Sequence, residues 1–120
     1  MSAPRDDSVY LSHLRDAITR VASYLDGVDE ALFFETPLFQ DGVTRQLEII
    51  GEAAKHLSGA FRSAHPGIPW RQIIGMRSKL IHDYMHVNLQ AVWDTATVDL
   101  PKLRVQLFPP AADEPGSNGG

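Results

Sequence analysis

The sequence contains no cysteine. This absence excludes a thiolate zinc site, a disulfide framework and a cysteine nucleophile. A chain of 120 residues can still bury roughly two-thirds of its unfolded surface, so it needs neither disulfides nor a metal to fold as one domain.

Long apolar runs are absent as well. No stretch approaches the ~20 residues that span a bilayer, and the start of the chain lacks a basic segment followed by an apolar one. We therefore expect a cytoplasmic protein without a membrane segment. No stretch alternates with period two, and no glycine-rich loop links a strand to a helix, so the pattern favours helices.

Apolar residues recur at helical spacing in several long segments. The predicted helices cover about residues 8–26, 43–58, 70–86 and 88–107. Between the first two, the phenylalanines around Pro37 predict a short turn or helix against the core. Gly75 is placed to split the third helix, and Pro101 to kink or restart the fourth.

We therefore expect an all-α up-down bundle of four to five helices. The bundle covers residues 1–108 as one domain. Residues 109–120 contain no core-forming side chain and are predicted to form a disordered tail.

Charge is distributed unevenly along the chain. The net charge of −4 by itself disfavours a nucleic-acid ligand. Between Arg45 and His86, however, six basic residues accompany three acidic ones, a local net charge of +3. This excess is either a site that holds a phosphate backbone or a fluctuation of surface charge, and the counts favour neither.

The segment from Gly75 to Tyr84 carries the side chains best suited to chemistry. On a helix of about 100° per residue, its apolar residues fill an arc of roughly 180°, and Arg77 falls inside that arc. A guanidinium in such a place is paired or serves a site. A structural role is equally open, because Arg77 could pair with Glu48 or Glu52 or extend to solvent.

His82 has a side chain whose charge can switch near neutral pH, which suits acid–base catalysis, although a lone histidine on a polar face is usually only solvated. On one helix, Arg77 and His82 lie about 140° apart and would not meet. Either a short extra turn or a twofold-related chain could bring them together. The wide apolar arc favours the second arrangement, a homodimer.

A metal site is a weaker interpretation. His82 and His86 lie one turn apart, but no third ligand is apparent, and Asp83 stands where the HExxH pattern requires glutamate. We therefore expect no metal and no other cofactor. Glu48 and Glu52 could form an acid–base pair, but a salt-bridge role is favoured.

The segment Arg77-Ser78-Lys79-Leu80-Ile81-His82-Asp83-Tyr84 matches the R-x4-H-x-Y pattern of HEPN-domain proteins. Residues 45–53, 69–76 and 92–94 also resemble the HepT-like family, so that the resemblance covers about residues 8–107. It implies a dimeric HEPN bundle that acts as a metal-independent endoribonuclease. It also implies the toxin of a bacterial type VII-like toxin–antitoxin system, with two R-x4-H motifs meeting at the dimer interface.

Carried over to this sequence, the resemblance makes Arg77 and His82 catalytic. His82 would exchange protons with the RNA, and Arg77 would neutralise the developing charge. Ser78 and Lys79 would support substrate binding. Tyr84 would be the residue to which a partner nucleotidyltransferase, the antitoxin, adds AMP and thereby blocks the toxin.

Two positions depart from the family's pattern. Ser78 stands where asparagine is common, and Met85-His86 stands where Phe-Gly is common. The competing interpretation is a dimeric helical adaptor or nucleotide-binding module for a nucleotidyltransferase, without catalysis. The acidic net charge and Ser78 favour that alternative, whereas Arg77 in an apolar arc near His82 favours the ribonuclease.

Overall fold

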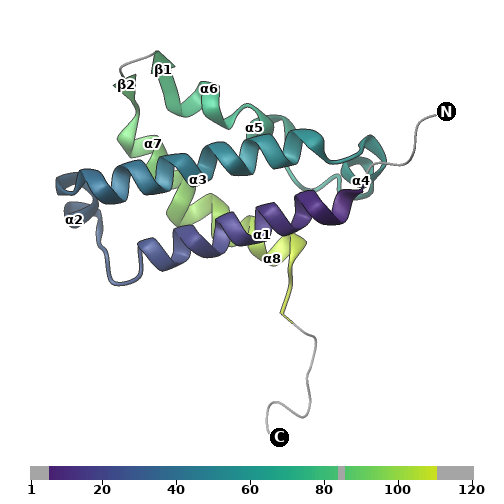
Figure 1. Cartoon of the computed structure of the whole chain (residues 1–120), viewed down its shortest axis with the longest axis horizontal. Coiled ribbons are helices and arrows are strands. Elements are labelled where there is room, and N and C mark those ends of the chain that lie inside the picture. Colours follow the sequence, from purple (N-terminus) through teal and green to yellow (C-terminus); the bar gives the residue numbers. More distant parts are fainter. Residues whose placement is uncertain (1–5, 84–85, 111–120) are drawn as a thin grey trace, which may run out of the picture.

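The computed structural model describes residues 6–83 and 86–110, with His82 and Asp83 described by their backbone alone. Two long helices, α1 (Asp7–Tyr24) and α3 (Pro37–His56), run antiparallel and make the most extensive packing contact of the bundle (Figure 1). The short helix α2 (Glu30–Glu35) connects them along the chain, and its Phe33 is fully buried. The prediction of a short element against the core is thus confirmed.

The starts of these helices follow from their capping residues. The Asp6 side chain accepts a hydrogen bond from the Ser8 amide at 3.1 Å, and Asp29 accepts one from the Leu32 amide at 2.9 Å. Pro37 occupies the first turn of α3, where its missing N–H costs no helical bond. Helix α3 consequently begins before residue 43, the predicted start.

The third predicted helix, 70–86, is wrong in its second half. The chain forms α5 (Trp70–Ile74), α6 (Met76–Leu80) and a hairpin of β1 (Ile81–Asp83) with β2 (His86–Val87). Gly75 separates the two helices, as predicted. The Leu80 carbonyl accepts a hydrogen bond from the Asn88 amide at 2.8 Å. This bond satisfies the last carbonyl of α6. The chain therefore continues as a strand instead of adding another helical turn.

The last helical segment is continuous from Leu89 to Leu107, consisting of α7 (Leu89–Asp94), the π-helical turn η1 (Thr95–Asp99) and α8 (Leu100–Leu107). Asn88 caps α7 through a hydrogen bond from the Ala91 amide at 3.0 Å. Pro101 lies in the first turn of α8, where the hydrogen-bonding pattern of the helix changes. Because it has no N–H to offer the preceding turn, that turn widens into the π-helical η1.

The core lies where α1 and α3 meet the shorter helices. Its largest fully buried side chains come from α1, α2, α3, α6 and α7 and from the residue after α3; they are Phe33, Leu14, Leu47, Ile50, Leu57, Leu80, Val21, Val43 and Val92. Each such side chain contributes roughly 1.5–3 kcal/mol by leaving water. The predicted all-α bundle is confirmed, with one short hairpin added.

Gly51 brings α5 and α6 close to α3. A Cβ at this position would lie 3.1 Å from the Ile73 carbonyl oxygen, so a larger residue would push the two segments apart. The close approach places α6 alongside the middle of α3, and with it Arg77. None of the described helices is long and apolar enough to cross a membrane. The predicted tail lies almost wholly outside the described residues.

Candidate active site

Arg77 projects from α6 toward α3 and forms an ion pair there. Its Nε lies 3.3 Å from Oε2 of Glu48, whose other oxygen, Oε1, lies 3.7 Å from Nη1 of Arg45. Glu48 is 22% exposed and the two arginines 73% and 70%. One partly buried carboxylate therefore orients two exposed guanidinium groups on the same side of α3.

The placement of Arg77 within an apolar arc is wrong. Met76 and Leu80, one turn apart on α6, are 5% and 1% exposed and fill the chain's own core. Arg77 lies about 100° around the helix axis from Met76. Its side chain therefore leaves the core-facing side of α6 and reaches solvent. Of the two carboxylates considered for Arg77, Glu48 is the partner, whereas Glu52 pairs with His56 at 3.1 Å. Since the core fills most of the arc, the arc does not require a second subunit.

His82 lies beyond the helix that carries Arg77. Because α6 ends at Leu80, the helical angle between Arg77 and His82 no longer applies. In the hairpin, Ile81 pairs with Val87 and Asp83 with His86, so His82 is the extra residue of a bulge. Bulges redirect side chains and are frequent beside active sites. The His82 side chain and the whole of Tyr84 lie outside the described residues.

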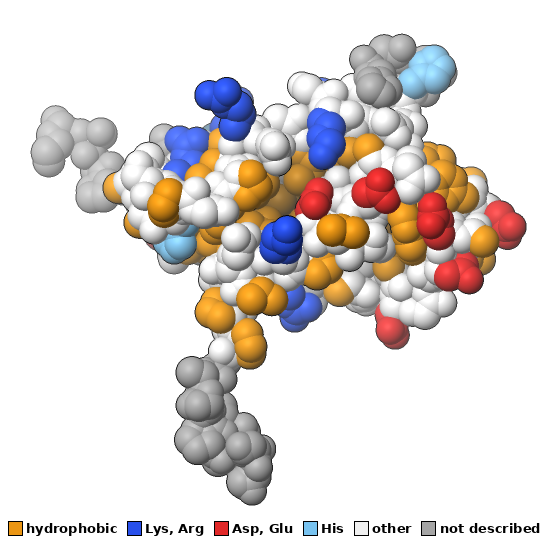
Figure 2. Space-filling model, turned by 180° about the vertical axis from the view of Figure 1, so that it is seen from behind, with side chains coloured by type: hydrophobic (Ala, Val, Ile, Leu, Met, Phe, Trp, Pro, Cys, Tyr) orange, Lys and Arg blue, Asp and Glu red, His pale blue; other side chains and the backbone are white. Residues whose placement is uncertain are grey.

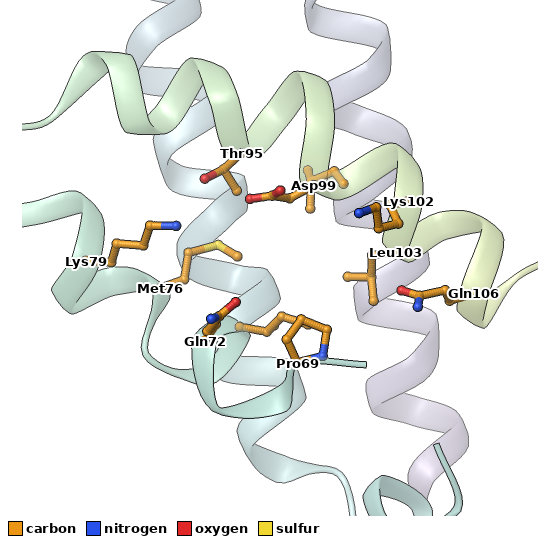
Figure 3. A pocket seen from close by; sticks show the side chains of 11 residues that line it. Pro69, Gln72, Met76, Lys79, Thr95, Asp99, Lys102, Leu103 and Gln106 are labelled. Atoms are coloured by element: carbon orange, nitrogen blue, oxygen red, sulfur yellow. The ribbon is translucent and has the colours of Figure 1, made fainter. Parts of the chain in front are cut away.

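Ser78 and Lys79 are both exposed on α6. Lys79 does not join Arg77. It lines a cavity of about 180 Å³ between α5–α6 and η1–α8, where its side chain extends toward the same space as Lys102 and Asp99 (Figure 3). The structure thus places the two cations of the motif, Arg77 and Lys79, on different sides of α6.

Two grooves flank the pair formed by Arg45 and Glu48, which line both. One groove, of about 430 Å³, lies between α1, α3 and α6 and includes Arg77. The other, of about 360 Å³, includes Val87 and Leu89 beside the hairpin. The Arg45–Glu48 pair therefore forms the wall that the two grooves share. Arg77 lies in the larger groove, and Val87 of β2 lies in the smaller one.

The sequence interpretation missed three aromatic residues in the larger groove. The Tyr10 ring stacks on His56 with centroids 5.1 Å apart and meets the His13 ring edge-on at 6.0 Å. The spacing of Tyr10 and His13, three residues apart on one helix, was an available signal. The contribution of His56, from the far end of α3, required the α1–α3 packing.

Charge is unevenly distributed on one face of the molecule. On the side turned away from the view of Figure 1, acidic side chains gather toward the α2 end and basic ones over the other half (Figure 2). Among the described residues no group of three or more histidine, aspartate or glutamate side chains could hold a metal ion.

The bundle carries an arginine and a histidine five residues apart at a helix-to-hairpin junction. A family described as "Ribonuclease HepT-like" matches residues 14–107, and the chain belongs to this family. The predicted membership of the HepT-like family is thereby confirmed.

Three relatives illustrate the family's range. The chain is 37% identical over 107 residues to a "Putative RNase" of Caldanaerobacter subterraneus, covering 89% of this chain and 93% of the relative. It is 37% identical over 100 residues to a "Probable ribonuclease HepT" of Thermococcus cleftensis, covering 83% and 91%. A third match, in Methanocaldococcus jannaschii, is 37% identical over 104 residues, 87% of this chain and 47% of a "Gamma-glutamylcyclotransferase and putative RNase". No solved structure matches the chain.

Proposed function

We propose that this protein is an endoribonuclease that cleaves RNA without a metal ion, with Arg77 and His82 as catalytic residues. The observation that carries the proposal is the exposed guanidinium of Arg77 beside Glu48. Glu48 holds it at 3.3 Å while the side chain stays 73% exposed, as an electrostatic catalyst for a large anionic substrate needs. The family of ribonucleases to which the chain belongs supports RNA as that substrate.

The proposed reaction uses the nucleophile that RNA itself carries. His82 removes the proton of a 2′-OH, and the oxygen attacks the adjacent phosphorus. Arg77 neutralises the charge that develops on the phosphorane oxygens. The P–O5′ bond breaks and the leaving oxygen takes the proton back from the protonated His82. The products are a 2′,3′-cyclic phosphate and a 5′-hydroxyl.

A homodimer would bring Arg77 and His82 together if one chain alone does not. In this arrangement Arg77 of one subunit faces His82 of its twofold partner. Exposed Arg77 and the open grooves on either side of Glu48 leave room for a second chain to approach. Mixing the Arg77→Ala and His82→Ala proteins tests this, because a mixed dimer contains one intact site. Recovery of activity on mixing supports the shared site, and no recovery contradicts it.

The regulatory part of the proposal is a toxin–antitoxin pair in which a partner nucleotidyltransferase adds AMP to Tyr84. The added group would bring bulk and negative charge close in sequence to Arg77 and would compete with RNA for it. Mass spectrometry after co-expression with a nucleotidyltransferase encoded beside this protein measures the modification. An AMP adduct on Tyr84 that abolishes cleavage supports this role, and unmodified Tyr84 contradicts it without affecting the nuclease proposal.

The nuclease proposal is tested by incubating RNA with the purified protein in excess EDTA. The parent protein should cleave. The His86→Ala control loses a histidine from the facing strand of the same hairpin, but not the proposed catalytic one, and should cleave as well. The His82→Ala protein should not cleave. Cleavage that disappears in EDTA and returns with Mg²⁺ contradicts the proposal. A folded parent that binds a nucleotidyltransferase but never cleaves RNA supports the adaptor alternative.

A further inference from the structure

We infer that the groove between α1, α3 and α6 is a nucleotide subsite. Tyr10, His13 and His56 would contact one RNA base, and Arg45 and Arg77 the phosphate beside it. The inference rests on the proposed ribonuclease function and adds to it a place for a nucleotide that neighbours the cleaved bond.

The three rings form a supported wall of the groove. Tyr10 and His56 stack at 5.1 Å with an interplanar angle of 18°, and His13 stands at 90° to Tyr10 with centroids 6.0 Å apart. The His56 Nε2 is held 3.1 Å from the Glu52 carboxylate. Rings that are already ordered lose little side-chain entropy when a base stacks on them, and proteins bind unpaired RNA bases on such rings.

The groove has room for one nucleotide. Its volume is about 430 Å³, within the range of roughly 300–1,000 Å³ that small-molecule sites occupy. Ile49 and Ala53 of α3 contribute apolar surface to it, and Ala53 is only 4% exposed. An apolar floor beside aromatic rings suits the face of a base better than a charged ligand of the same size.

The remaining wall suits a phosphate. Arg45 and Arg77 share the single carboxylate of Glu48, at 3.7 Å and 3.3 Å. Two cations beside one anion leave a net positive charge on this wall, and both guanidinium groups are at least 70% exposed. The groove's other carboxylate, Glu52, lies on the side of the rings, paired with His56. A planar guanidinium group can donate two parallel hydrogen bonds to two oxygens of one phosphate. Rings and arginines thus line one groove that presents both kinds of contact an RNA nucleotide needs.

The test is binding of a fluorescent single-stranded RNA, 2′-O-methylated to block cleavage, followed by anisotropy. The protein is His82→Ala, so that binding is measured whether or not the parent cleaves. Tyr10→Leu and His13→Ala should each weaken binding by about 5- to 150-fold, the range expected for one stacked base. Tyr10→Phe keeps the ring and should bind as the parent does. Tyr24→Leu, near the other end of α1, is the matched control.

Abasic RNA makes the test independent of folding. One base is removed at each position of the oligonucleotide in turn, and one position should lose as much affinity as His13→Ala does. At that position the His13→Ala protein should lose nothing further. Equal binding by Tyr10→Leu, His13→Ala and the control overturns the subsite, even where the parent cleaves RNA. If the parent protein binds the methylated RNA but cleaves no unmodified RNA, the subsite stands and the ribonuclease proposal is refuted.

Discussion

Replacing Glu48 by alanine should slow catalysis without weakening substrate binding, and the protein should stay folded. Glu48 contacts Arg77 and Arg45 at 3.3 Å and 3.7 Å, and both arginines are at least 70% exposed. Exposed ion pairs of this kind contribute about 0.2–1 kcal/mol each. The free energy of unfolding should therefore fall by less than about 2 kcal/mol, which lowers Tm by at most about 10 °C.

The loss in rate comes from the freedom that Arg77 gains. An arginine side chain carries about 2 kcal/mol of rotamer entropy, so removing its anchor can lower kcat by up to about 30-fold. RNA affinity should stay the same or rise, because a carboxylate beside the phosphate-binding arginines is lost. Glu48→Gln keeps one acceptor for Arg77 and should give an intermediate rate.

Single-turnover cleavage and RNA binding, measured on the same proteins, separate these effects. Asp16→Asn, an exposed position of α1, is the control for the loss of one negative charge. The reasoning is refuted if Glu48→Ala leaves kcat unchanged. It is equally refuted if RNA binding weakens in proportion to the rate, because Glu48 would then act on binding and not on the orientation of Arg77.

Three further predictions concern the frame of the site. Gly51→Val forces α5 and α6 away from α3. It should therefore cost about 1–3 kcal/mol of stability in denaturant unfolding and reduce cleavage. A variant as stable as the parent would contradict the packing described. Asn88→Ala should cost about 1 kcal/mol by removing the cap of α7, with the hairpin amides exchanging faster in hydrogen-exchange measurements. Phe33→Ala should cost about 3–5 kcal/mol, because its side chain is fully buried, and a loss below 1 kcal/mol would contradict its place in the core.

The long helices could be predicted from the sequence because their stabilising contacts repeat at helical spacing. Leu14, Ile18 and Val21 of α1 follow the pattern and are buried. The hairpin could not be predicted in this way. Ile81 continues the apolar periodicity of α6, and the bond that ends this helix joins Leu80 to Asn88, eight residues later.

The site was predictable in part for the same reason. The motif and the family resemblance predict Arg77 and His82 as site residues within one short segment, and the sequence leaves two glutamates as the possible partners of Arg77. The choice between them depends on how closely α6 approaches α3, which Gly51 permits. The ring cluster joins Tyr10 to His56 across two helices, and no local pattern contains that contact.

The chemistry of the cleaved ends tests the central claim most directly. RNA is incubated with the protein in excess EDTA, and the fragments are analysed by mass spectrometry. Attack by the 2′-OH through His82 and Arg77 predicts fragments ending in 2′,3′-cyclic phosphate and 5′-hydroxyl, and no cut where a single 2′-deoxynucleotide precedes the bond. Fragments ending in 3′-hydroxyl and 5′-phosphate, or a cut at the 2′-deoxy position, would contradict the account.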